Sequence, residues 1–157
     1  MIKTNLLENI AAFNSQYASC IDDDQLESWP DFFVDKCFYK VTTAENYHKG
    51  LPAGLVYANS KGMLKDRISA LREANIYERH SYRHILSIPS KIVQSDEVLN
   101  VETSFLVNRI MRGGKMDIFA TGKYVDEFEK VESSWLLRKR VVVCDSISID
   151  TLLAIPL

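Results

Sequence analysis

The chain has 157 residues, of which 46% are hydrophobic and 25% are charged, and its formal net charge is −2. These values are typical of an ordinary globular protein, and we expect a single domain over residues 1–157. The nearly neutral charge argues against a basic surface for nucleic acid or for an anionic membrane.

We expect no targeting or membrane segment in this chain. Residues 1–5 lack the apolar run of a signal peptide, and no stretch approaches the roughly 20 apolar residues of a spanning helix. Cysteines are few and odd in number, at Cys20, Cys37 and Cys144, which disfavours a disulfide framework. We therefore expect a cytoplasmic protein with reduced, partly buried thiols.

The first 22 residues predict an amphipathic helix. Its apolar side chains recur at steps of three and four residues: Leu6, Ile10, Phe13, Tyr17 and Ile21. The acidic run 22–24 interrupts this stripe and is typical of a solvated helix end. Asp24 is a candidate cap for a second short helix through Ser28, and Pro30 suits the start of another turn.

The next part of the chain alternates short strand-type and helix-type segments. Residues 37–43 alternate and are rich in aromatic and β-branched side chains, so they predict a strand. A polar loop ending near Gly50 is expected next, followed by a short strand at 55–57. Ser60 is expected to cap a helix that ends near Asn75.

The second half of the chain contains four strand-type segments: 83–93, 99–111, 115–128 and 135–149. Pro89 suggests an edge or a break in the first, and Gly113-Gly114 predicts a hairpin turn between the second and third. Strands of this length must twist and bend, and Gly122 is a candidate bend site.

Helices first and then a long meander indicate the α+β class, with N-terminal helices packed on one face of a curved, mostly antiparallel sheet. Helices that close one side of a bent sheet make a cone with a pocket inside. The expected fold is therefore the nuclear-transport-factor-like (SnoaL-like) cone.

The densest polar cluster runs from Glu78 to His84. Two histidines and a carboxylate could bind iron, but His80 and His84 would lie roughly 13 Å apart on an extended strand. A hydrogen-bonded entry into a strand explains the cluster more simply. Because arginine and tyrosine are enriched at interfaces, a subunit contact is the other interpretation. Its candidate residues are Arg79, His80, Tyr82, Arg83 and His84.

Other chemistry is sparse. A histidine and an aspartate in a cone pocket can form an acid/base dyad, and the candidates are His84 or His80 with Asp22, Asp23 or Asp145. No phosphate-binding loop or nucleophile elbow is present. No cysteine is followed two or three residues later by histidine, so the chain lacks the ligands of a Rieske cluster. We assign no catalytic, cofactor-binding or metal-binding residue. The apolar run 151–157 is expected either to fold over this subunit or to be buried against a partner.

Several segments, taken together and in order, resemble the small (β) subunits of Rieske-type aromatic-ring-hydroxylating dioxygenases. The resemblance covers nearly the whole chain and is carried by Leu26–Phe33, Cys37–Val41, Asp66–His80, Tyr82–Leu86, Val143–Leu152 and Pro156–Leu157. It implies a cone-fold structural subunit without catalytic residues of its own. The substrate of the whole complex would be an aromatic carboxylate such as terephthalate.

The resemblance also implies partners and cofactors. Subunits of this family assemble with a catalytic large (α) subunit, commonly as α3β3, with the small subunits associating as a homotrimer. The Rieske iron–sulfur cluster and the mononuclear iron are expected in the large subunit and no cofactor in this chain. Two alternatives stay open: a stand-alone cone-fold dehydratase or isomerase using a His/Asp pair, and a small-ligand binding module.

Overall fold

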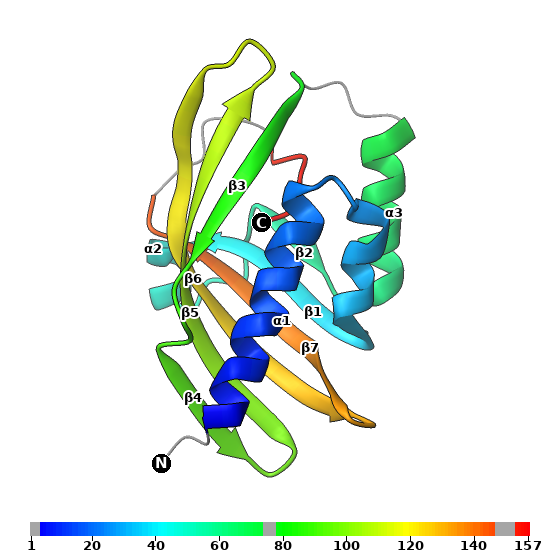
Figure 1. Ribbon diagram of the computed structural model, residues 1–157, viewed down its shortest axis with the longest axis vertical. Coiled ribbons are helices and arrows are strands. Elements are labelled where there is room, and N and C mark those ends of the chain that lie inside the picture. Colours follow the sequence, from blue (N-terminus) through cyan, green and yellow to red (C-terminus); the bar gives the residue numbers. More distant parts are fainter. Residues whose placement is uncertain (1–3, 74–77, 147–152) are drawn as a thin grey trace.

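The computed structural model describes residues 4–73, 78–146 and 153–157. The helices are α1 (Thr4–Asp22), the 3-10 helix η1 (Leu26–Phe32), α2 (Ala44–His48) and α3 (Lys61–Glu73). The strands are β1 (Phe33–Thr43), β2 (Val56–Ala58), β3 (His80–Leu86), β4 (Lys91–Ser95), β5 (Val98–Met111), β6 (Met116–Val131) and β7 (Ser134–Cys144). Figure 1 shows their arrangement.

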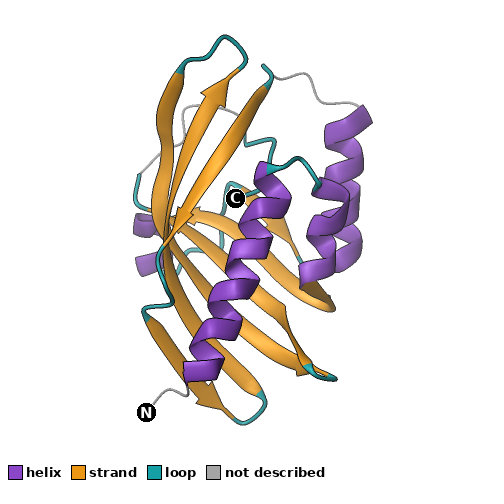
Figure 2. Ribbon diagram, in the orientation of Figure 1, coloured by secondary structure: helices purple, strands orange, loops and turns teal. Residues whose placement is uncertain are grey.

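All seven strands form one strongly curved sheet, in the order β2-β1-β7-β6-β5-β3. Strand β4 pairs with the first part of β5, on the same edge as β3. Only the β1–β7 pair is parallel among the described strands. Helices α1, η1 and α3 cover one face (Figure 2). This arrangement confirms the predicted α+β fold. None of the described helices is long and apolar enough to cross a bilayer.

The long β5–β6 pair contains one irregularity of the sheet. A register shift between Val107 and Asn108 marks a bulge, and bulges increase local bending. The predicted bend site, Gly122, lies three residues beyond this irregularity on the partner strand. A Cβ atom there would overlap the backbone carbonyl of Val143 on β7. Glycine is therefore required by the close approach of the neighbouring strand.

Most predicted elements are confirmed, but three local predictions are wrong. Asp22, expected in a solvated helix end, has a side chain that is only 3% exposed. Asp24 does not cap η1; the residue before that helix is Gln25, and Asp24 is left-handed (φ 57°) with its carboxylate bonded to Arg72. Part of the predicted polar loop is helix α2, because the Thr43 hydroxyl accepts a bond of 3.2 Å from the Asn46 amide and caps it.

Other boundaries differ only in extent. The first long strand is divided into β3 and β4, with Pro89 between them, as predicted. The Ser60 hydroxyl accepts a 3.2 Å bond from the Met63 amide, confirming its role as a cap. The last strand ends at Cys144, and the described residues 145 and 146 are no longer strand, so its predicted extension to 149 is wrong. The expected end of the helix near Asn75 lies outside the described residues.

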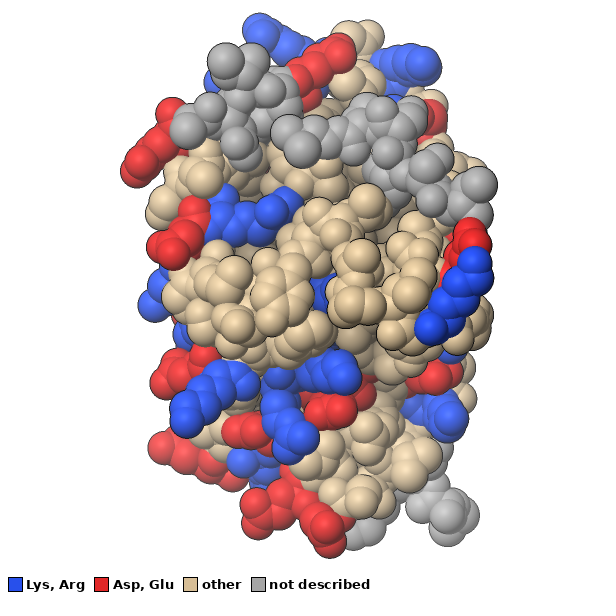
Figure 3. Space-filling view, turned by 180° about the vertical axis from the view of Figure 1, so that it is seen from behind, with Lys and Arg blue, Asp and Glu red and all other residues tan. Residues whose placement is uncertain are grey.

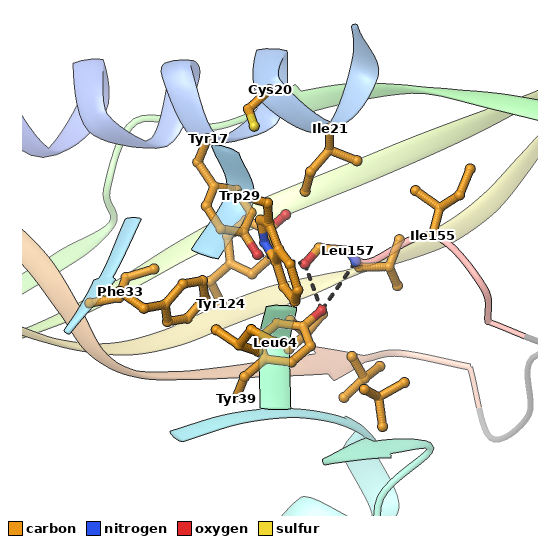
Figure 4. Packing of buried hydrophobic residues seen from close by; sticks show 14 of the residues in the cluster. Tyr17, Cys20, Ile21, Trp29, Phe33, Tyr39, Leu64, Tyr124, Ile155 and Leu157 are labelled. Atoms are coloured by element: carbon orange, nitrogen blue, oxygen red, sulfur yellow. Dashed lines mark hydrogen bonds between the residues drawn. The ribbon is translucent and has the colours of Figure 1, made fainter. Parts of the chain in front are cut away.

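The core fills the space between the helices and the concave face of the sheet. Trp29 packs edge-on against Phe33 and Tyr39, with ring centroids 5.6 and 5.1 Å apart. Residues 153–157 enter this aromatic cluster, and Leu157 is completely buried (Figure 4). Of the two fates expected for this apolar segment, the described part takes the first, since it packs inside its own subunit.

Candidate functional site

Strand β3 carries the predicted contact residues and alternates between two environments. The Arg83 side chain is 63% exposed, with its guanidinium 4.0 Å from Asp22 Oδ2 on α1, and Arg79 is exposed just before the strand. Tyr82 and His84 point inward and are buried. His80 is half-buried, with Nδ1 2.8 Å from the backbone oxygen of Glu78. Arg79 and Arg83 are therefore the most accessible of the five candidates.

The outer face beside Arg83 is apolar. Arg83 pairs with Asn108, which pairs with Ile118, so these side chains lie in one row across three strands. Ile85 and Ile118 are 56% and 63% exposed. From behind, the sheet shows a broad uncharged area bordered by mixed positive and negative groups (Figure 3). An arginine beside exposed isoleucines is a composition typical of contact surfaces.

One of the predicted His/Asp pairs forms. His84 Nδ1 lies 2.6 Å from Asp22 Oδ1, and the His84 amide donates a 2.9 Å bond to Asp22 Oδ2. Asp145 instead accepts a bond from the Thr121 hydroxyl, and His80 is held by Glu78. The pair joins the last residue of α1 to the middle of the edge strand β3.

The position of the Asp22–His84 pair favours a structural role. Its two side chains are 3% and 0% exposed, respectively, and His84 Nε2 has no hydrogen-bond partner among the described residues. A groove of about 290 Å³ runs between α1 and β3 and includes both side chains in its lining. Because Nε2 is enclosed, it is not presented to a molecule in that groove. Asp22 instead satisfies a backbone N–H on the edge of the sheet, which limits further strand pairing there.

The cone interior contains a second polar group, which was not predicted from the sequence. Arg140 donates two 2.8 Å bonds to Asp126 and one of 2.7 Å to Asn14. Its guanidinium carbon lies 4.2 Å from the Tyr17 ring centre and 4.0 Å from that of Tyr124. Burial lowers the pKa of the guanidinium, but the adjacent Asp126 carboxylate outweighs it and raises the pKa, so Arg140 stays charged.

A sequence signal for this pair did exist. Asp126 and Arg140 are directly opposite neighbours on β6 and β7, and both occupy inward positions that the alternation reserves for apolar residues. A charged residue at such a position needs an opposite charge beside it. Their side chains thus occupy the part of the cone in which a pocket was expected.

The described residues contain no metal-binding cluster, and their three thiols are buried. No cluster of three or more His, Cys, Asp or Glu side chains suited to a metal occurs within 4–73, 78–146 and 153–157. Cys20, Cys37 and Cys144 are free and buried. Burial, together with the Asp145 carboxylate, raises the pKa of Cys144 to about 12, so this thiol stays protonated and unreactive.

These features define a class of structure, namely a cone whose interior is filled by its own side chains. Solved structures share this fold at low identity, among them a protein assigned as a scytalone dehydratase from Novosphingobium aromaticivorans DSM 12444 (TM-score 0.68, 22% identity, 93% of this chain and 89% of that one). The nuclear-transport-factor-like (SnoaL-like) cone is thereby confirmed.

Sequence relatives identify the family. The profile of the ring hydroxylating beta subunit family matches residues 16–151. Beta subunit 1 of the terminal oxygenase component of terephthalate 1,2-dioxygenase from Comamonas sp is 51% identical over 150 residues, covering 94% of this chain and 96% of that protein. The anthranilate 1,2-dioxygenase small subunit from Burkholderia cepacia is 34% identical over 148 residues, covering 94% and 92%.

A solved structure agrees over the full length. The beta subunit assigned to an aromatic-ring-hydroxylating dioxygenase of Novosphingobium aromaticivorans DSM 12444 has a TM-score of 0.90 and 39% identity, with both chains completely covered. The chain described here belongs to the family of ring-hydroxylating dioxygenase beta subunits. The predicted resemblance is thereby confirmed.

Proposed function

We propose that this chain is the non-catalytic structural small subunit of a Rieske non-haem iron dioxygenase and that it positions the catalytic large subunits. The observation that carries the proposal is membership of the beta-subunit family over residues 16–151. A cone interior occupied by packed aromatic rings and a neutralised ion pair suits a rigid support. The whole chain would act as one cone-fold unit in the cytoplasm.

The cofactors and stoichiometry are part of this proposal. The Rieske cluster and the mononuclear iron would both belong to the large subunit, in an α3β3 assembly with a trimer of small subunits at its base. Electron transfer between a cluster and an iron in adjacent large subunits requires a fixed geometry, which such a trimer would maintain. The substrate would be an aromatic carboxylate such as terephthalate, by similarity to the Comamonas subunits.

The proposed contact segment comprises Arg79, His80, Tyr82, Arg83 and His84, of which Tyr82 and His84 are buried and would support the contact from inside the subunit. Arg79 and Arg83 would meet acidic groups of a neighbouring subunit, because their guanidinium groups are exposed. His84 would contribute indirectly, because its bonds to Asp22 hold β3 against α1. The apolar outer face around Ile85 would extend the contact.

Co-expression with the large subunit tests this assignment. Arg79→Ala/Arg83→Ala should lower the fraction of assembled complex in size-exclusion chromatography by at least tenfold at micromolar concentration. Lys65→Ala/Lys130→Ala removes two exposed positive charges elsewhere and should leave assembly unchanged. An unaltered complex in the arginine variant would remove this segment from the interface.

Oxygen consumption tests whether catalysis requires the large subunit. The co-purified complex, supplied with its electron donors, should consume oxygen with terephthalate, whereas the small subunit alone should not. Oxygen uptake with anthranilate but not terephthalate would reject terephthalate as the substrate, while leaving an aromatic carboxylate and the structural role intact. Aromatic turnover by the small subunit alone would reject the structural role.

A further inference from the structure

The outer face of the sheet carries three large apolar side chains that are more than half exposed. Ile85 on β3 is 56% exposed, and Ile118 and Met116 on β6 are 63% and 67% exposed. Leu106 lies opposite Ile85, and Ile110 lies opposite Met116. Because directly opposite neighbours share a face of the sheet, these side chains gather on one side of three adjoining strands, in the uncharged area of Figure 3. Contiguous exposed apolar groups on a globular chain mark contact surfaces.

Positive charges border this apolar group at one end. Arg79 precedes β3, and Arg112 and Lys115 flank the two-glycine turn between β5 and β6; all three residues are exposed. The Arg112 amide donates a 3.2 Å bond to the Arg79 carbonyl oxygen, which places the entry to β3 beside this hairpin. Lys115 directly precedes Met116, so the charged end adjoins the apolar side chains.

The acidic residues near this end do not cancel its charge. Asp117 is already paired with Arg109, whose Nη2 lies 2.9 Å from its Oδ2. Glu78 is exposed beside Arg79, but the exposed cations of this end outnumber it. The end is therefore locally positive, although the whole chain has a formal net charge of −2.

Charge and symmetry indicate which partner fits this surface. A second copy would present the same apolar group with the same excess of positive charge, and like charges across an interface are unfavourable. A contact between two identical faces is also twofold, which does not build a ring of three small subunits. A different chain that offers an apolar surface with an acidic border would complement both features.

We propose that the catalytic large subunit docks on this outer-face surface and contributes an apolar area bordered by carboxylates. The surface consists of Ile85, Met116, Ile118, Arg79, Arg112 and Lys115. This inference rests on the proposed function and adds to it the partner that covers the outer face. Contacts between small subunits would then use other parts of the chain.

Co-expression of the full-length chain with its large subunit, followed by size-exclusion chromatography, tests the proposal. Met116→Asp combined with Ile118→Asp places two carboxylates on the apolar group and should lower the fraction of co-eluting complex at least tenfold. Met63→Asp combined with Ser69→Asp adds two carboxylates at exposed positions of α3 and should leave co-elution unchanged. Full co-elution of the outer-face variant would overturn the surface assignment alone. A wild-type chain that does not co-elute at all would overturn the proposed function as well.

A thiol footprint examines the same surface without adding charge, and it decides if the aspartate variant does not fold. Cys20, Cys37 and Cys144 are buried, so Ile118→Cys introduces a thiol that a maleimide reaches in the native chain. Mass spectrometry of the small chain should show labelling at least tenfold slower in the complex than in the small subunit alone. The control Ser69→Cys should be labelled equally fast in both. Equal rates for Ile118→Cys would overturn the proposal. Slow labelling already in the small subunit alone would also overturn it, because a second copy would then cover this face.

Discussion

Replacing Asp126 with asparagine removes the negative partner of Arg140 while keeping the size of the side chain. Arg140 is completely buried, and its two bonds to Asp126 are its only contacts with an opposite charge among the described residues. Leaving one member of a buried pair uncompensated costs about 3–5 kcal/mol. We therefore expect Asp126→Asn to lower the free energy of unfolding by that amount, a large share of the roughly 5–15 kcal/mol of a typical domain.

Removing both charges should be less costly. Asp126→Leu combined with Arg140→Met leaves no buried charge, but the Asn14 side-chain oxygen loses the donor that now lies 2.7 Å away. One orphaned polar group costs about 1–3 kcal/mol. Urea unfolding followed by circular dichroism measures both variants, and equal slopes would show that the unfolded states are comparable. A loss below about 1 kcal/mol in Asp126→Asn, or a double variant less stable than it, would refute this reasoning.

Three further predictions follow from local contacts. Gly122→Ala should destabilise the fold by more than about 4 kcal/mol in urea unfolding, because its Cβ overlaps a carbonyl of β7. Gly113→Ala, which meets no atom within 4 Å, is the control and should change stability by less than about 0.5 kcal/mol. Asp22→Ala should lower the free energy of unfolding by about 2–4 kcal/mol, because it leaves two buried nitrogen groups of His84 without their partner. It should also speed hydrogen exchange of the His84 amide, and an unchanged exchange rate would contradict the Asp22–His84 contact. Cys144, whose pKa burial and a nearby carboxylate raise to about 12, should gain thiolate only far above neutral pH. It should therefore react with a disulfide reagent at pH 8 only after unfolding, and rapid reaction of Cys144 in the native chain would contradict this prediction.

The parts of the fold that depend on local pattern could be predicted. Leu99, Val101, Phe105 and Val107 share one face by alternation, and all four are buried. Pro89 lacks the amide that a continuous strand would need, and the first long segment is broken there. Such predictions succeed because side-chain direction in a strand has a fixed period of two residues.

The remaining features depend on contacts between distant residues. Asp22 and His84 lie 62 positions apart, and any of several aspartates was an equal candidate before the fold was known. The parallel pairing of β1 with β7 joins segments about 100 residues apart, which alternation does not specify. Residues 153–157 are apolar, but apolar composition alone cannot choose between the interior of the same subunit and a partner surface.

Native mass spectrometry of this chain, co-expressed and co-purified with the large subunit, tests whether it is a structural subunit of a larger oxygenase. We expect one complex containing equal numbers of the two subunits, with all iron in the large subunit after the two are separated. A folded chain that remains at monomer mass beside a folded large subunit, or that keeps stoichiometric iron after separation, would show that it is not such a subunit.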